Sequence, residues 1–372
     1  MGAIRDFFFP ASTPIKVSDV EASLTPIQIQ DNVYQILGGR TTTTRPVAMS
    51  VPAVARARNI ICGTIGSLPL TTFNRITGEY VDPHRVINQP DPRVAGFVIY
   101  TWLAEDIFLH GVGYGQVLEM YSATDGGRVR SWTRIAPDRV TVDTDPLNNT
   151  ITGYAVDGKR VPNFGIGSII RFDGGDEGLL NRAGKTIQAA VYLENSAVTY
   201  AKDPLPTIAL KSTGTNLPAE RINSLLSAWR VARQSRATAF LNADVDIKEI
   251  GFDPKSLQLT EARQYVALEL ARACGIPAYF LSAETTSMTY SNAVSERRSL
   301  VDFSLRPILK AIEERLSLPD FVPNPVMVRF DLDDFLRGNA LERAQVYEIL
   351  NRIGAMSVEQ IQREEDLIPN EN

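Results

Sequence analysis

The spacing of apolar residues changes near Gly184, and this change limits the folds that the chain can adopt. Between residues 68 and 173 the apolar residues come in short runs separated by turn signals such as Asp157-Gly158, as is typical of antiparallel strands. From residue 184 onward most of them recur at helical spacing. A sheet-containing part followed by a helical part predicts an α+β fold. Because 372 residues exceed what one hydrophobic core usually holds, we expect more than one structural lobe.

The sheet-containing part is predicted to include two helices. The helix expected over residues 51–67 carries its apolar residues at helical spacing, at Val54, Ala57, Ile61 and Ile65. It should end at Gly66, with Pro69 soon after. The helix expected over residues 97–110 has an apolar face made of Phe97, Tyr100, Trp102, Leu103 and Ile107. Strands are expected over 70–73, 116–121, 129–135, 140–142 and 169–172.

The second part is predicted to be built on long helices. They are expected over residues 186–201, 219–234, 253–274, 291–316 and 341–353. Asp253-Pro254 is a helix start, and Gly275 is a helix stop. The helix between them would be roughly 31 Å long, which suits a spoke better than a core element.

Four local features refine this prediction. Pro307 should bend the helix over 291–316. Ser357 and Gln360 form a capping box for a last short helix. Residues 237–252 are interpreted as a hairpin. The helix over 219–234 is expected to bury its apolar residues, Ile222, Leu225, Leu226 and Trp229.

The charge and cysteine content exclude several classes of protein. The chain has 38 basic and 43 acidic residues, a net charge of −5, so it lacks the basic excess of proteins that hold nucleic acid by neutralising phosphates. Cys62 and Cys274 are far apart, no Cys/His spacing suits zinc, and both thiols are expected to be buried. We find no long apolar run and no signal-peptide pattern, so we expect a soluble protein made in the cytoplasm.

Two motifs that could carry chemistry have simpler explanations. The glycines from Gly111 to Gly115 are reminiscent of a dinucleotide-binding loop, but here a helix precedes them and a strand follows, the reverse of the required order. Two acidic clusters could bind a divalent ion, but neither has calcium-loop spacing, and solvated loop acids are the better explanation. The clusters are Asp173, Asp176 and Glu177, and Asp331, Asp333 and Asp334. Neither His84 nor His110 nor a cysteine lies in a nucleophile motif, so no catalytic residue, metal or cofactor is expected.

Several blocks of the sequence, taken in order, resemble the portal proteins of tailed bacteriophages. Residues 51–70 are similar to the family's first helix and its "SLPL" strand, residues 109–114 to its glycine and tyrosine block, and residues 172–180 to the loop before a stem helix. The most specific blocks are Ala271 to Pro277, Thr289 to Asn292, Leu305 to Glu313, Phe330-Asp331, Leu336 to Asn339, Arg343 and Gly354. The resemblance runs from about residue 50 to the end, although Ser357 to Gln360 departs from the family's usual Asn-Glu pair.

The resemblance implies an α+β portal-type subunit that forms a ring of about twelve copies. The implied regions are an N-terminal arm (1–50), an α+β wing (51–183), a first stem helix (184–203), a small α/β clip (204–252), a second stem helix (253–280), a tunnel loop (281–290), a long wing helix with a return strand (291–337) and a short helical crown (338–372). The cluster from Phe7 to Pro10 in the arm is either an anchor for a neighbouring subunit or part of a flexible tail.

The tunnel loop is the candidate for the part that faces DNA. Its candidate residues are Ser282, Glu284, Thr285, Thr286, Ser287, Met288 and Thr289. Glu284 is the only charge among residues 281–290, which suits a channel in which sliding DNA must not be trapped through its phosphates. Arg56, Arg58, Arg297 and Arg298 could contact DNA or form ion pairs between subunits, and the sequence leaves both possibilities open.

The function that the resemblance implies is a portal ring at one capsid vertex of a virion, through which double-stranded DNA is packaged and ejected. The implied partners are other copies of the chain, DNA in transit, the terminase large subunit, the major capsid protein and a head-tail adaptor, with no membrane. Another ring-forming head-tail connector is an alternative. A DNA-processing packaging enzyme is less favoured, because the chain lacks a phosphate loop of the Gly-x-x-x-x-Gly-Lys-Ser/Thr type.

Overall fold

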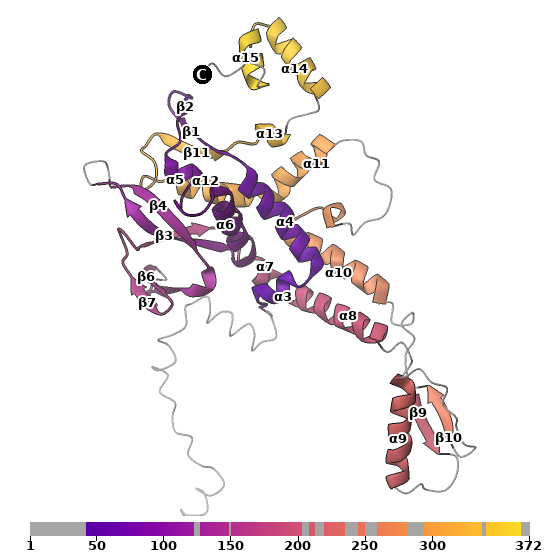
Figure 1. Ribbon diagram of the computed structural model, residues 1–372. Helices are drawn as coiled ribbons and strands as arrows, with labels where there is room; N and C mark the ends of the chain where they lie inside the picture. The colour runs from indigo at the N-terminus through magenta and orange to yellow at the C-terminus, as the bar shows by residue number, and fades with distance from the viewer. Residues whose placement is uncertain are drawn as a thin grey trace, which may run out of the picture. The chain divides into compact units, whose positions relative to one another are not determined.

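The structure is a computed structural model of the chain (Figure 1). It describes residues 42–122, 127–148, 150–202, 208–212, 219–234, 245–249, 259–281, 293–336 and 340–365. These residues fall into two compact units, one made of residues up to 188 and from 268 onward, and one made of residues 189–267. The predicted cluster at Phe7, the helix start at Asp253 and the loop over 282–290 lie outside the described residues.

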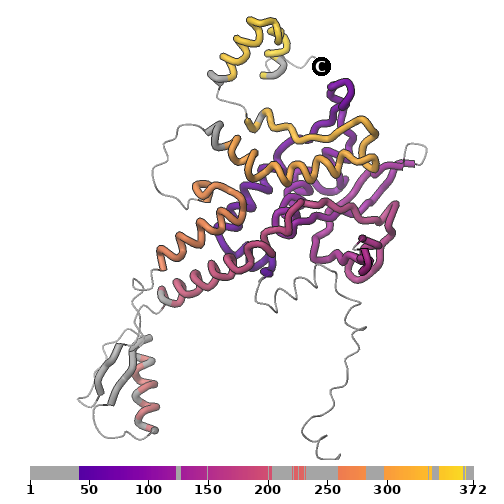
Figure 2. Tube along the Cα trace, turned by 180° about the vertical axis from the view of Figure 1, so that it is seen from behind, coloured from indigo at the N-terminus to yellow at the C-terminus, as the bar shows by residue number. Residues whose placement is uncertain are grey.

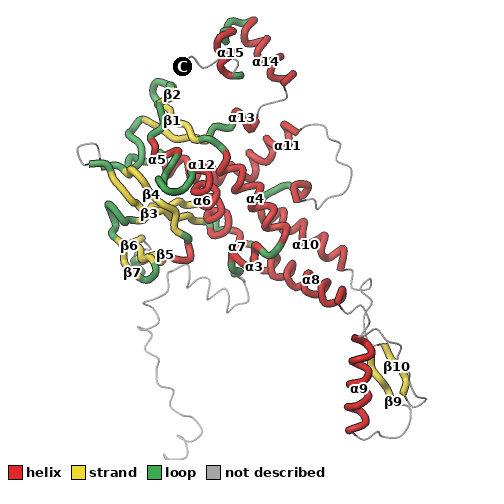
Figure 3. Tube along the Cα trace, in the orientation of Figure 1, coloured by secondary structure: helices red, strands yellow, loops and turns green. Residues whose placement is uncertain are grey.

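Among its described residues, the first unit contains three small antiparallel sheets, with strand orders β11-β1-β2, β4-β3-β8 and β5-β6-β7. The strands are β1 (Leu70–Asn74), β2 (Tyr80–Val81), β3 (Val112–Met120), β4 (Val129–Ile135), β5 (Val140–Thr144), β6 (Ile151–Val156), β7 (Lys159–Val161), β8 (Ile169–Asp173) and β11 (Val326–Phe330). In Figure 3 these strands, in yellow, gather on one side of the helices. Strand β11 pairs with β1 although more than 250 residues separate Thr71 from its partner Arg329.

The helices of the first unit include one pair that forms its centre, α4 (Pro52–Ser67) and α6 (Gly96–His110). The others are α3 (Arg45–Met49), α5 (Arg85–Asn88), η3 (Pro137–Arg139), α7 (Leu179–Arg182), η4 (Ala278–Leu281), α11 (Ala293–Leu300), the π-helical turn η5 (Val301–Leu305), α12 (Arg306–Leu316), α13 (Asp333–Leu336), α14 (Ala340–Arg352) and α15 (Val358–Glu364). Helix α8 (Gly184–Lys202) begins in the first unit, and α10 (Leu259–Cys274) ends in it. None of the described helices is long and apolar enough to span a bilayer.

The core of the first unit follows the apolar pattern of α4. Val54, Ala57, Ile61 and Ile65 are all buried where α4 packs along α6, as predicted. On the other side of α6, four aromatic rings from four elements meet. Tyr100 of α6 makes edge contacts with Trp132 of β4 and Phe330 of β11, and Trp132 contacts Phe172 of β8. This cluster joins α6 to two of the sheets.

Strand β11 lies at the edge of its sheet, and other residues of the same chain accept hydrogen bonds from its outward N–H groups. Its outward N–H groups, at Val326, Val328 and Phe330, donate to Pro323 O, Ser317 Oγ and Glu313 Oε1 at 2.8, 2.9 and 3.0 Å. Glu313 and Ser317 lie one turn apart on α12, so a single helix face caps two of the three donors. Covering an edge in this way prevents it from pairing with another chain.

The structure corrects the predicted face of α6. Tyr100, Leu103 and Ile107 are buried, but Phe97 is 53% and Trp102 42% exposed. Helix α6 is covered on more than one side, by α4, α7, β3 and β4, and therefore also buries Ile99, Leu109 and even Glu105. A helix buried on most of its surface does not mark its exposed positions by period alone.

Two further predictions need correction. Strands β6 and β7 were not expected, although Asp157 and Gly158, both with positive φ, form the turn that the sequence indicates there. The hairpin predicted over 237–252 left out a partner, because its described strand, β10 (Val245–Glu249), pairs with β9 (Ile208–Ser212), which precedes α9 (Ala219–Gln234) in the chain. The bounds of α9 itself agree with the prediction.

The described part of the second unit contains a two-stranded sheet, β10-β9, with helix α9 beside it (Figure 1). Helix α9 was expected to bury its apolar residues, but Ile222 is 43% and Leu226 47% exposed in the single chain. The parts of α8 and α10 in this unit lie side by side (Figure 2) and are joined by an ion pair between Glu194 and Arg263, at 2.7 Å. Two strands and one helix offer too little surface to enclose an apolar core of their own.

Candidate functional site

The predicted tunnel loop is flanked by described elements on both sides, η4 before it and α11 after it. Before the loop, α10 ends in a Schellman motif. Gly275 has a φ of +65°, and its N–H donates to Arg272 O at 3.1 Å, while the N–H of Ile276 donates to Ala271 O at 3.1 Å. The helix stop predicted at Gly275 is therefore confirmed, and the chain turns sharply toward η4.

Three side chains from other parts of the chain donate hydrogen bonds to carbonyl oxygens between Ala273 and Phe280. Arg182 of α7 donates through Nη2 to Ala273 O at 2.7 Å. Ser304 of η5 donates through Oγ to Gly275 O, and Arg56 of α4 donates through Nε to Phe280 O. Carbonyls at the end of a helix lack partners within the helix and carry its negative dipole end, so cationic and hydroxyl donors stabilise them. We call these three residues the loop-base donors.

After the loop, the predicted helix over 291–316 is divided by the π-helical turn η5. The N–H of Arg306 donates to Val301 O, five residues back, and the next residue, Pro307, has no N–H to offer. A bend at Pro307 was predicted, and the structure shows this π-helical turn shortly before it. In the described part of this helix, one apolar stripe is buried, made of Val301, Leu305, Ile308, Ile312 and Leu316.

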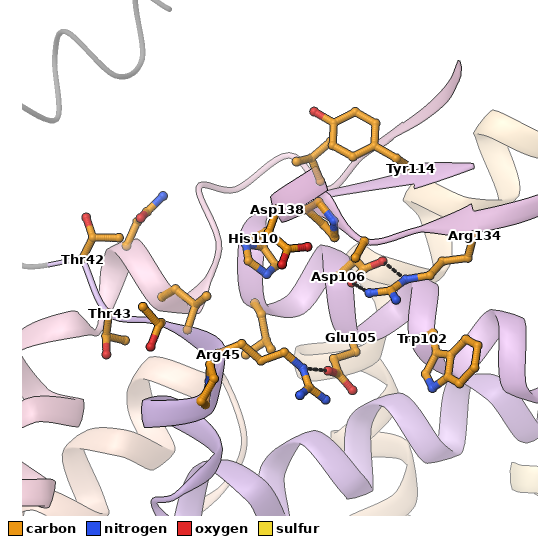
Figure 4. Close-up of a pocket in the computed structure, with 18 residues that line it drawn as sticks. Thr42, Thr43, Arg45, Trp102, Glu105, Asp106, His110, Tyr114, Arg134 and Asp138 are labelled. Carbon is orange, nitrogen blue, oxygen red and sulfur yellow. Dashed lines mark hydrogen bonds and ion pairs between the residues drawn. The ribbon is translucent and has the colours of Figure 1, made fainter. Parts of the chain in front are cut away.

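A pocket of about 720 Å³ lies in the first unit, between the chain entering α3, the C-terminal half of α6 and the start of β3 (Figure 4). Its lining contains two adjacent carboxylates of α6, Glu105 and Asp106, that are almost fully buried. Arg45 and Arg134 also line it, with Trp102, His110 and Tyr114. The sequence did not single out the carboxylates, because acidic residues in a helix are ordinarily solvated.

Both carboxylates are neutralised by arginines. Glu105 accepts from Arg45 Nε at 2.6 Å and from Arg58 Nε at 2.5 Å. Burial opposes its ionisation, but the two arginines outweigh burial and lower the pKa of Glu105. Asp106 accepts from Arg134 through two nitrogens, yet burial raises its pKa to about 6. These contacts connect α3, α4 and β4 to α6, so the charges hold elements together.

Burial lowers the pKa of His110, which lines the pocket, and so favours its neutral form. The two cysteines do not line the pocket and are unsuited to nucleophilic chemistry. Burial raises the pKa of the Cys62 thiol, and it raises the pKa of Cys274 to about 12, so both cysteines stay protonated. Both were expected to be buried, and both are. Among the described residues, no three His, Cys, Asp or Glu side chains gather as a metal site would require.

The remaining sequence candidates lie in different surroundings. Asp173 pairs with Arg171, and Asp176 pairs with Arg182. The run from Gly111 to Gly115 follows α6 and opens β3, so it is not a phosphate loop; a side chain at Gly111, where φ is +74°, would collide with Asp176 O. Arg58 donates to Glu105, and Arg56 donates to Phe280 O. Arg297 and Arg298 are exposed.

A comparison with known families identifies the family of the chain. The family model described as phage portal protein matches residues 52–366, which is most of the chain. This chain belongs to the phage portal protein family. The resemblance noted in the sequence is thereby confirmed, and the subunit has the mixed α and β structure expected of a portal, a structural component of the head-tail connector.

Individual portal proteins are similar along most of their length. The probable portal protein of Streptomyces phage phiC31 is 23% identical over 364 residues, covering 91% of this chain and 79% of its own. An HK97 family phage portal protein from Corynebacterium diphtheriae is 27% identical with a TM-score of 0.65, covering 79% of this chain and 97% of its own. A chain from the neck of a native gene transfer agent particle, computed with C12 symmetry, is 19% identical with a TM-score of 0.56, covering 90% of this chain and 96% of its own.

Proposed function

We propose that this portal subunit forms a closed ring of about twelve copies at one vertex of a phage capsid, and that double-stranded DNA passes through the axial channel during packaging and ejection. The observation that carries the proposal is the family match over residues 52–366, which spans the chain on both sides of the loop at 282–290. The gene transfer agent neck with C12 symmetry, whose chain has a similar fold, supports the number of subunits.

The regions keep the division that the sequence predicts. The α+β part over 51–183 with residues 291–337 is the wing, residues 184–203 and 253–280 are the stem helices, 204–252 the clip, 281–290 the tunnel loop and 338–372 the crown. The β1–β11 pairing supports assigning the return strand to the wing, because it joins these two segments. Residues 42–50, assigned to the arm by sequence, support an earlier boundary between arm and wing, since Ala48 is buried and Arg45 binds Glu105.

The partners and location follow from that role. The ring would bind the terminase large subunit during packaging, the major capsid protein around the wing and a head-tail adaptor after packaging. It would assemble in the host cytoplasm and remain in the virion. The subunit itself would supply no catalysis, since its buried carboxylates are held by arginines and its described thiols stay protonated.

Negative-stain imaging and mass measurement of the purified full chain test the proposal. We expect rings with an axial hole and a mass of about 490 kDa, twelve times the 41.0 kDa chain. A monomer under all conditions would contradict the ring. A ring that does not bind a cognate terminase would favour another head-tail connector component, and ATP hydrolysis by the purified chain would favour a packaging enzyme.

A further inference from the structure

The three loop-base donors converge on a short segment of backbone although they come from distant parts of the chain. Their acceptors lie within eight residues, from Ala273 to Phe280, while the donors lie on α4, α7 and η5. Arg56 is separated from its acceptor by 224 residues and Arg182 by 91. The segment is therefore attached to separate elements of the first unit immediately before the loop begins.

Ser304 adds a second feature, because it lies after the loop while its acceptor lies before it. The bond from Ser304 Oγ to Gly275 O therefore joins the two chain segments that enter and leave the loop. Ser304 is buried, at 8% exposure, in the π turn that interrupts the long helix. Within a helix, serine hydroxyls often return to a carbonyl of their own helix. Here the hydroxyl of Ser304 instead donates to Gly275 O, in the chain segment on the other side of the loop.

The elements that supply the donors are themselves fixed in the core. Helix α4 buries Val54 and Ala57 on either side of Arg56, and Leu179 and Leu180 of α7 are buried next to Arg182. Leu305, beside Ser304, is fully buried. A displacement of the loop base would thus have to move packed side chains, and packed interiors transmit displacement rather than absorb it.

We propose that Arg56, Arg182 and Ser304 are positioning residues that fix both ends of the tunnel loop to the body of the subunit. This proposal rests on the proposed function, in which the loop meets DNA. With the base fixed, a load that moving DNA places on the loop passes into α4, α7 and η5. Without these bonds, the segment from Ala273 to Phe280 would shift under the load, and the loop would no longer keep its position in the channel.

The test uses the full chain with Ser304→Ala and Arg182→Ala, alone and combined, and with Ser304→Thr and Arg182→Lys as variants that keep a donor. Asp302→Asn, on the exposed side of the same turn, and Arg75→Ala, an exposed arginine of the β1–β2 turn, are the matched controls. Rings are first checked by negative stain. Backbone hydrogen exchange is then measured in the peptides over 276–281 and 293–304.

In rings of the two alanine variants, exchange in both peptides should rise about tenfold, because local opening becomes easier. Nuclease-protected DNA per particle, in procapsids assembled with each variant, should fall several-fold for the double variant. The Ser304→Thr and Arg182→Lys variants and both controls should behave as the parent chain does. Rescue by a retained donor separates positioning from general packing.

Two results would overturn the proposal. One is unchanged exchange and packaging in the double alanine variant. The other is an equal loss in Ser304→Thr and Ser304→Ala, which would indicate that only the volume of the side chain matters. Failure of the proposed function would look different, because the parent chain itself would then form no ring or its procapsids would protect no DNA.

Discussion

The two units of this subunit differ in what their apolar residues contact. In the first unit, the apolar stripe of α4 is buried against α6, and rings such as Phe172 are fully enclosed. In the second unit, α9 carries an equally regular stripe, yet Ile222 and Leu226 remain nearly half exposed. The same helical pattern thus gives a closed core in one unit and an open face in the other. Among the described residues, the first unit closes its core with its own chain, whereas α9 keeps apolar side chains exposed in the single chain.

The largest effect is expected in the closed core. Replacing Phe172, which is fully buried against Trp132, by alanine removes its contacts and leaves a cavity. We expect Phe172→Ala to lower the free energy of unfolding by about 3–5 kcal/mol in denaturant titrations. Phe164→Ala is the matched control, because Phe164 is 90% exposed and its loss should change stability by less than about 0.5 kcal/mol. Equal effects at the two sites would contradict the proposed closed core.

The buried charges of α6 are the next test. Glu105→Ala leaves the guanidinium groups of Arg45 and Arg58 without their carboxylate. Breaking a buried pair is costly, but Arg45 is half exposed and regains water, so we expect a loss of about 2–3 kcal/mol in the free energy of unfolding. Glu119→Ala, whose pair with Arg130 is exposed on both sides, should cost less than about 0.5 kcal/mol. If the two variants lose the same, these charges do not hold α3, α4 and α6 together.

The edge of β11 gives a smaller effect. Glu313→Ala removes the acceptor of the buried Phe330 N–H, and we expect the free energy of unfolding to fall by about 1–2 kcal/mol. Glu313→Gln keeps an oxygen at this position and should lose less than the alanine variant does. Glu314→Ala, at an exposed position of the same helix, is the control and should be near neutral. An identical loss in the alanine and glutamine variants would show that the bond to Phe330 contributes nothing.

The two adjacent carboxylates should respond to pH in opposite directions. Because the pKa of Glu105 is lowered in the fold, its contribution to stability is present above its unfolded pKa and is lost as the pH falls through its folded pKa. The pKa of Asp106 is raised to about 6, so its ionisation costs stability as the pH rises from about 4 to 6. Relative to the parent chain, Glu105→Gln should be less sensitive to acid, and Asp106→Asn should lose less stability between pH 4 and 6. Unfolding curves at several pH values check both signs.

Local signals in the sequence predicted much of this structure. The capping box is one example, since Ser357 N donates to Gln360 Oε1 and Gln360 N to Ser357 Oγ, at 2.8 and 3.2 Å. The helix stop at Gly275 is another. The predicted site residues themselves lie outside the described part of the chain and stay predictions. The loop-base donors had no local signal, because bonds such as Arg56 to Phe280 O join residues 224 positions apart.

The smallest effect on the subunit itself is expected at the open face of α9, and it is the sharpest test of the comparison. Leu226 is 47% exposed, so Leu226→Ser should change the free energy of unfolding of the dissociated subunit by less than about 0.5 kcal/mol. In the ring the same residue would be covered by another copy or by a partner, and the serine would weaken that contact. We therefore expect fewer intact rings, or weaker terminase binding, at low protein concentration, measured by mass photometry.

Leu103→Ser, in the closed core, should do the reverse and destabilise the subunit strongly before any effect on assembly appears. If Leu226→Ser leaves both ring formation and terminase binding unchanged, the exposed stripe of α9 is an ordinary solvated surface. If it destabilises the isolated subunit as strongly as Leu103→Ser does, the second unit has a closed core of its own. The first result would contradict the covering of α9 by another chain, and the second would remove the distinction between the two units.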